Sequence, residues 1–128
     1  MQLVRELPHP VEKVWRAITL PELVAEWLLP GDFRAEPGHV FTFDASVGAI
    51  ACEVLEAEPP RRLVYSWRAL DLDSTVTIEL APQNGGTRLT LSQTGFTPEQ
   101  TRAFHGARAG WGNFLDRLDR LMTEGDAR

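Results

Sequence analysis

Few side chains in this sequence could support acid–base chemistry. Its three histidines, His9, His39 and His105, lie before the first predicted helix, at the start of a predicted strand and on the last predicted helix. A general base must lie within hydrogen-bond reach of the proton that it removes, and nothing in this spacing brings two histidines together. His105 falls at the margin of an apolar helical face, which is typical of a partly exposed side chain. We therefore predict no catalytic residue.

Metal and nucleotide sites are not indicated either. No pair of histidines or cysteines has the spacing of a zinc site. Gly106, Gly110 and Gly112 fall inside a predicted helix, where backbone amides are already hydrogen-bonded and cannot surround a phosphate. Cys52 lies on a predicted strand and is expected to be a small buried side chain. We predict no metal and no cofactor.

Aromatic residues carry the more specific information. By their periodicity, seven of them point into the space between a sheet and the last helix: Trp27, Phe41, Phe43, Tyr65, Trp67, Trp111 and Phe114. A sheet that curves around one helix rarely fills its whole concave side, so we expect some of these rings to line a cavity. Gln93 lies on the same apolar face, and both structural hydrogen bonding and orientation of a ligand are open to its buried amide. The predicted ligand-binding residues are Trp27, Phe41, Phe43, Trp67, Gln93, Gly110, Trp111 and Phe114.

Gly110 belongs to this set because of its position on the last helix. A glycine costs about 1 kcal/mol relative to alanine in a helix interior, so three glycines between residues 106 and 112 imply a geometric use. Successive helical residues are about 100° apart, which places Gly110 and Gly112 at opposite margins of a buried stripe centred on Trp111. Gly110 could border a cavity or a close-packed strand, and we expect the cavity.

The amino-terminal third predicts a short strand and two short helices. Residues 3–7 alternate, and Pro10 then fits the first turn of a helix. Apolar residues at three- and four-residue spacing define one face of each helix; they are Val11, Val14, Trp15 and Ile18 in the first helix and Leu23, Val24, Trp27 and Leu28 in the second. Pro30-Gly31 is predicted to end the second helix.

Residues 33–95 change to a period of two, which predicts an antiparallel meander. The predicted turns are Pro37-Gly38, Val47-Gly48, Pro59-Pro60, Leu70 to Ser74 and Asn84-Gly85-Gly86. A capping box over Thr97 to Gln100 predicts the start of a long amphipathic helix. Its apolar stripe consists of Phe104, Ala107, Trp111, Phe114, Leu115, Leu118 and Met122, and the apolar face of the sheet is expected to cover it.

Composition limits the class of protein. The 128 residues are 43% hydrophobic and 24% charged, which fits one domain over residues 1–124 with a frayed end at 125–128. The net charge of −5 argues against a nucleic-acid partner, because phosphate binding needs clustered lysines and arginines. No apolar run approaches the length of a membrane span or a signal peptide. We expect a cytoplasmic protein without membrane insertion.

Several segments together resemble one known family. They are Val14-Trp15-Arg16-Ala17-Ile18, Pro21-Glu22-Leu23 leading to Trp27, Glu53 to Glu56 followed by Pro59-Pro60 and Arg61 to Trp67, and Gly110-Trp111 with Leu115 and Leu118. They are similar to proteins homologous to the activator of heat-shock-protein-90 ATPase, within the START-like (SRPBCC, birch-pollen-allergen-like) superfamily. The resemblance implies an α+β helix-grip fold, in which a curved antiparallel sheet wraps around a long C-terminal helix and a hydrophobic cavity. Two short helices would lie between the first and second strands.

Three functions are compatible with such a domain. The first is binding of a small hydrophobic molecule in the cavity, without covalent chemistry. The second, implied by the family name, is a protein-interaction module that acts on a chaperone ATPase. The third is a cofactor-free cyclase or hydrolase that uses the same cavity and needs a polar group with a shifted pKa there. Gln93, His105 and Asp44 are the candidates for that group, and Gln93 does not titrate.

Overall fold

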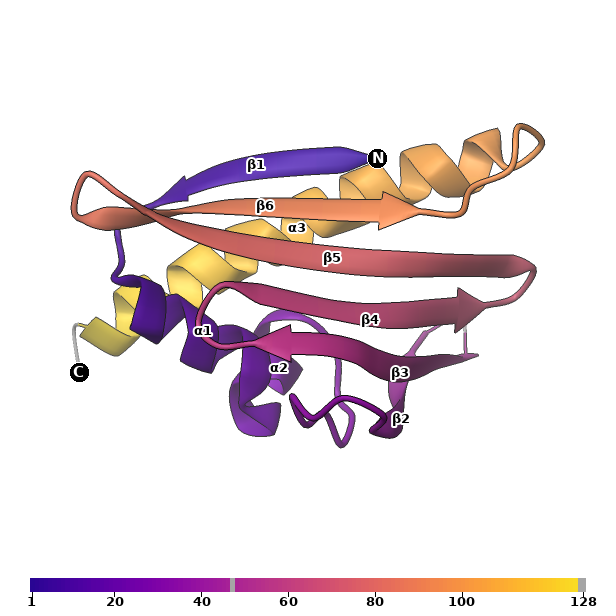
Figure 1. Ribbon diagram of the computed structural model, residues 1–128. Helices are drawn as coiled ribbons and strands as arrows, with labels where there is room; N and C mark the ends of the chain where they lie inside the picture. Colours follow the sequence, from indigo (N-terminus) through magenta and orange to yellow (C-terminus); the bar gives the residue numbers. More distant parts are fainter. Residues whose placement is uncertain (47, 127–128) are drawn as a thin grey trace.

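A computed structural model describes residues 1–46 and 48–126. Figure 1 shows a six-stranded antiparallel sheet with a long helix across one face. In chain order the elements are β1 (Gln2–Leu7), α1 (Val11–Thr19), α2 (Pro21–Trp27), β2 (Val40–Ala45), β3 (Gly48–Glu58), β4 (Arg62–Ala69), β5 (Leu72–Gln83), β6 (Gly86–Thr94) and α3 (Thr101–Asp126). The sheet order is β1-β6-β5-β4-β3-β2. This arrangement confirms the predicted α+β helix-grip fold with two short helices between β1 and β2.

The helices all contribute to one layer. In Figure 1, α3 crosses the sheet, and α1 and α2 lie beside its C-terminal half. The apolar faces predicted for α1 and α2 are buried at Val14, Ile18, Val24 and Trp27. No helix in the described part of the chain is long and apolar enough to span a membrane.

The inner face of the sheet forms most of the core. Strand side chains alternate between the two faces, and the apolar set of each strand points toward α3. These buried residues include Phe41, Phe43, Leu63, Tyr65, Trp67, Val76, Ile78, Leu80, Leu89 and Leu91, as predicted. Val64 is also buried, although its position in the alternation predicts an exposed side chain. The neighbouring bulge, between Val54 and Glu56, lies on β3 and leaves the alternation of β4 intact, so Val64 faces outward and is covered by its neighbours.

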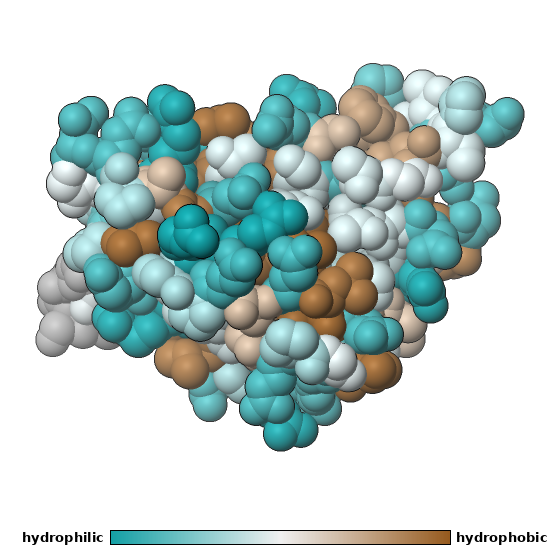
Figure 2. All heavy atoms as spheres, viewed as in Figure 1, coloured by the Kyte–Doolittle hydropathy of each residue, from teal (hydrophilic) through white to brown (hydrophobic). Residues whose placement is uncertain are grey.

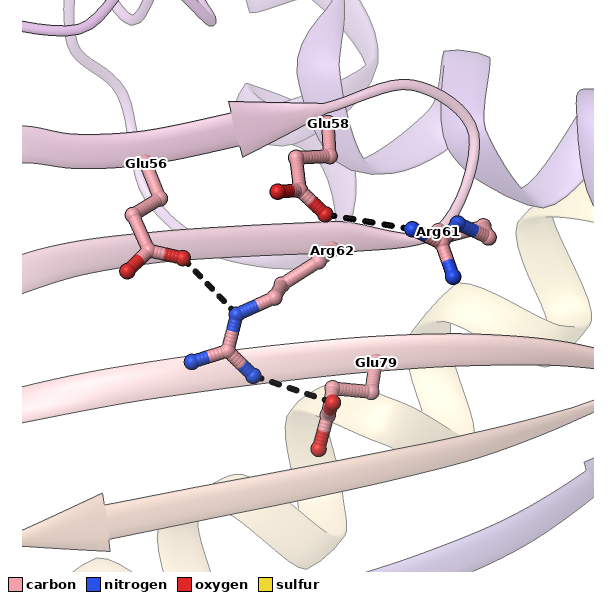
Figure 3. A network of polar contacts seen from close by, with 5 residues as sticks. All are labelled: Glu56, Glu58, Arg61, Arg62 and Glu79. Carbon is pink, nitrogen blue, oxygen red and sulfur yellow. Dashed lines mark hydrogen bonds and ion pairs between the residues drawn. The ribbon is translucent and has the colours of Figure 1, made fainter.

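The outer face of the sheet carries paired charges. Figure 3 shows Arg62 of β4 between Glu56 of β3 and Glu79 of β5, with Nε–Oε2 and Nη1–Oε2 distances of 2.8 and 2.9 Å. Arg61 pairs with Glu58 beside it at the β3–β4 turn, at 3.3 Å. In Figure 2, which views this face, hydrophilic residues gather over the middle and apolar residues appear as separate spots. Exposed pairs of this kind add little stability individually, so the main consequence is a polar outer surface.

The turns of the meander differ in one place from the prediction. Leu70, with φ of 56°, and Asp71 form the whole β4–β5 turn, because β5 already begins at Leu72. The predicted break from Leu70 to Ser74 was therefore wrong in extent, and Ser74 is a buried strand residue. At the β5–β6 turn, Asn84 and Gly85 both have positive φ, 52° and 81°, as a tight hairpin requires. Val47, part of another predicted turn, lies outside the described residues.

The start of the long helix also differs from the prediction. The predicted capping contact is present, since the Thr97 backbone N–H donates to Oε1 of Gln100 at 2.9 Å. However, Nε2 of Gln100 donates to the carbonyl oxygen of Asp71 at 3.0 Å. This bond ties the segment to the β4–β5 turn, and α3 begins only at Thr101. At its other end α3 continues to Asp126, beyond the predicted domain end at residue 124, while residues 127–128 lie outside the described part.

Candidate ligand-binding site

A row of aromatic rings connects the sheet to α3. Phe41 and Phe43 of β2 have ring centroids 5.1 Å apart, and Phe43 lies 5.9 Å from Trp67 of β4. Trp67 contacts Trp111 of α3 at 5.2 Å, and Trp111 contacts Phe114 at 5.6 Å. We call these five residues the aromatic row. Alternation on the strands and the helical period on α3 bring them together, as the sequence predicted for the space between sheet and helix.

Burial varies along the aromatic row. Phe41, Phe43 and Trp111 are almost completely buried, Trp67 is 9% exposed, and Phe114 is only half-buried. Tyr65, the neighbour of Phe43 and Trp67, is also buried, and burial raises its pKa well above 10. The row therefore runs from the core under β2 to a partly exposed end on α3.

Gly110 lies beside the partly exposed end of the row. It precedes Trp111 and is four residues before Phe114, so it shares a helical face with Phe114. A Cβ placed on Gly110 would meet no atom within 4 Å outside its own helix, whereas one on Gly112 would lie 3.6 Å from Nη2 of Arg5. No strand packs closely against Gly110, so the close-packing alternative is excluded. That this open space receives a ligand stays a prediction.

Gln93 is the centre of a buried hydrogen-bond chain. Its Oε1 accepts from the indole Nε1–H of Trp111 at 2.8 Å, and its Nε2 donates to Oγ of Ser74 at 2.9 Å. Ser74 in turn donates to the carbonyl oxygen of Trp67 at 2.8 Å. Gln93 is 1% exposed. The chain links β4, β5, β6 and α3 through the backbone of Trp67 and the indole of Trp111, which gives Gln93 a structural role. A contact of Gln93 with a ligand stays a prediction.

Sequence reasoning missed Ser74. The prediction placed this residue in a turn, yet the structure places it on the inner face of β5, where it is 3% exposed. The period-two pattern of Val76, Ile78 and Leu80 extends back by one step to Ser74. That step would have identified Ser74 as a buried polar neighbour of the apolar face.

Trp27 is the member of the predicted set that lies on α2. Its side chain is 1% exposed, and its indole Nε1–H donates to the carbonyl oxygen of Ala17 at 2.8 Å. This bond connects α2 to α1. A buried indole usually needs such a partner, so the contact accounts for Trp27 as a core residue, and a direct contact with ligand remains a prediction.

The candidate catalytic groups have separate surroundings. Nε2 of His9 lies 3.0 Å from Oδ1 of Asp119, and Nε2 of His39 lies 2.8 Å from the carbonyl oxygen of Asp32. Asp44 and His105 are exposed on β2 and α3. Cys52 is buried as predicted, and its burial raises the pKa of the thiol to about 12, which leaves it protonated and unreactive at neutral pH. Within residues 1–46 and 48–126, no three His, Cys, Asp or Glu residues form a group that could hold a metal ion.

Comparison with known proteins places this geometry in a family. The model of the family "Activator of Hsp90 ATPase homolog 1-like protein" matches residues 8–123. No curated protein matches significantly. Among solved structures, protein MLL2253 from Mesorhizobium loti is 41% identical with a TM-score of 0.94, over 97% of this chain and 96% of that chain. Protein NE0264 from Nitrosomonas europaea is 28% identical with a TM-score of 0.85, over 100% and 96%.

A further relative is longer than this chain. DynU16, described as a protein in the dynemicin biosynthetic locus, is 27% identical with a TM-score of 0.85. The match covers 98% of this chain and 47% of DynU16, so this chain corresponds to about half of that protein. The family match over residues 8–123 and the full-length likeness to MLL2253 agree with the helix-grip geometry. The chain therefore belongs to the family of activator of Hsp90 ATPase homolog 1-like proteins, with a START-like fold.

Proposed function

We propose that this protein binds a small hydrophobic molecule between the sheet and α3, without covalent chemistry. The observation that carries the proposal is the contact between Trp67 and Trp111, which joins sheet and helix at 5.2 Å. The row continues to the half-buried Phe114, and the empty side of Gly110 adjoins it. Aromatic walls next to unfilled space are the usual features of a site for an apolar ligand.

The predicted ligand-binding residues fall into two groups, those that would contact the ligand and those that support the site. Trp67, Gly110, Trp111 and Phe114 would contact the ligand, with Phe43 behind them. The remaining members act on the shape of the site: Gln93 holds Trp111 by a hydrogen bond, and Trp27 and Phe41 belong to the packed core. Contact with Phe114 would contribute most to the binding free energy, because its exposed apolar surface would be buried by the ligand and such burial is the main favourable contribution to binding.

The family supports a binding role without selecting a ligand. The helix-grip fold of this superfamily is a ligand-binding fold, and a fold alone does not determine the molecule bound. The relative DynU16 belongs to a biosynthetic locus, which is consistent with a small organic molecule as ligand. The exposed positions of Asp44 and His105, away from the buried row, do not favour the cyclase or hydrolase alternative.

The proposal is tested by titrating fatty acids, flavonoids and polyketide-like aromatics into the protein. We expect at least one class to cause a saturable change in tryptophan fluorescence and a rise in Tm, because ligand binding to the folded state stabilises it. Gly110→Leu should weaken this binding by filling the space beside Phe114. Gly106→Leu is the matched control, since Gly106 is exposed on the same helix and also has no neighbour within 4 Å. A panel without any spectral or thermal response would contradict the proposal.

A further inference from the structure

A hollow of about 530 Å³ lies where β6 leads into α3. It is bounded by the end of β6, the segment 95–100 and the first turns of α3, and we call it the head hollow. This volume is within the range of small-molecule sites. The head hollow lies about two turns of α3 away from Trp111, so it adjoins the aromatic row without being part of it.

The walls of the head hollow combine aromatic rings with uncharged polar groups. Phe96 and Phe104 meet edge to face, with centroids 5.5 Å apart. Thr94, Thr97, Thr101 and Gln100 also line the hollow. Among the described residues that line it there is no Asp, Glu, Lys or Arg, and the charged group at the wall is the α-ammonium of Met1, which donates to the carbonyl oxygen of Gln93 at 3.2 Å. Such a wall suits an aromatic molecule with a hydroxyl or carbonyl group, because the rings can contact its apolar part while the polar residues of the wall can hydrogen-bond its polar group.

One residue belongs both to the head hollow and to the hydrogen-bond chain. Gln93 contributes to the wall of the hollow, and its side chain accepts from Trp111 and donates to Ser74. Any change in the position of Gln93 therefore alters the hydrogen bond of the Trp111 indole. The indole N–H of Trp111 would therefore report an occupant of the head hollow that moves Gln93.

Building on the proposed function, we infer that the head hollow is a docking place beside the aromatic row and that it takes an aromatic molecule with a hydroxyl or carbonyl group. Phe96 and Phe104 would hold its ring by edge and face contacts. The hydroxyls of Thr94 and Thr97 would pair with its polar group. Gln93 would transmit docking to the Trp67–Trp111 pair.

The experiment uses 2-naphthol as the probe and naphthalene as its counterpart without a polar group. Binding is followed by NMR through the backbone amides and the indole N–H signals, with Trp111 assigned from Trp111→Phe. We expect 2-naphthol to shift amides between residues 94 and 105 together with the Trp111 indole, and naphthalene to bind more weakly. Phe104→Ala should weaken 2-naphthol binding roughly tenfold, as loss of an aromatic contact and its buried area implies.

Matched variants separate the head hollow from the aromatic row. Leu121→Ala shortens another half-buried apolar side chain of α3, outside both the head hollow and the aromatic row, and should leave the shifts at residues 94–105 in place. His105→Trp, at an exposed position on the wall, should also weaken binding and does not depend on core packing. If Gly110→Leu abolishes binding while Phe104→Ala and His105→Trp leave it unchanged, the inference is overturned and the proposed function stands. Equal or tighter binding of naphthalene overturns the polar group assigned to the ligand, and no binding of either probe counts against both proposals.

Discussion

The buried amide of Gln93 allows a quantitative test of how the helix is attached to the sheet. Gln93→Leu keeps a similar side-chain volume and removes both hydrogen-bonding groups. The Trp111 indole N–H, which donates to Gln93 at 2.8 Å, then has no acceptor in a position that is 2% exposed. Ser74 keeps its own bond to the carbonyl oxygen of Trp67 at 2.8 Å, so it contributes less to the loss.

The expected magnitude follows from these contacts. A buried donor left without a partner costs about 1–3 kcal/mol, and we expect Gln93→Leu to lower the free energy of unfolding by about 2–3 kcal/mol once the weakened Ser74 contact is included. Trp111→Phe removes the donor and part of the packing, at a cost of about 2–4 kcal/mol. The double variant contains neither the orphaned N–H nor the orphaned Oε1. Its loss should therefore be smaller than the sum of the single losses by about 1–2 kcal/mol.

Urea denaturation of the wild type, both single variants and the double variant measures this coupling. The slope with denaturant should stay constant, since the buried surface hardly changes. For a domain of this size each kcal/mol corresponds to roughly 3–5 °C in Tm. Losses that add to within about 0.5 kcal/mol, the agreement expected of independent sites, would refute the hydrogen-bond chain as the link between α3 and the sheet.

Three further predictions follow from single positions and from the charge distribution. Gly110→Ala should raise the free energy of unfolding by up to about 1 kcal/mol through helix propensity, because its Cβ meets no neighbour; a clear drop in the urea midpoint would show hidden close packing. Burial raises the pKa of Cys52 from 9.0 to about 12, so the folded state keeps a proton that the unfolded state loses. The contribution of Cys52 to the free energy of unfolding should be fully present below pH 9 and be lost as the pH rises toward 12, so the fall should be less steep in Cys52→Ala. Native Cys52 should not react with a thiol reagent at pH 8; rapid native labelling would contradict its burial. The protein should leave the turnover of a bacterial Hsp90 unchanged in an ATPase assay, because four outer-face arginines, Arg61, Arg62, Arg68 and Arg88, each pair with a carboxylate of this chain; a saturable stimulation would revive the chaperone-module hypothesis.

The order of helices and strands and the two faces of the sheet could be predicted from the amino-acid pattern alone, apart from the exact starts of β5 and α3. Period-two alternation assigned Phe43, Trp67 and Gln93 to the buried side, because side chains of a strand point alternately to opposite faces. Three- and four-residue spacing similarly defined the stripe around Trp111. The family was predicted from the sequence motifs of several segments and was confirmed over residues 8–123. Alternation, helical spacing and short motifs each depend only on residues close together in the chain, so they can be recognised without the structure.

Which buried groups meet depends on contacts between distant segments. The partners of Gln93 come from β5 and α3, 19 and 18 residues away along the chain, and no local pattern specifies such a pairing. The bond between Gln100 and the carbonyl oxygen of Asp71, across 29 residues, lies just before the start of α3 at Thr101, and the local capping pattern does not specify it. Whether Gly110 faced a strand or open space depended on how far α3 stands from the sheet. That distance is set by the large side chains packed between them, Trp67 and Trp111 above all, because a filled core holds its layers apart by the volume of what it contains.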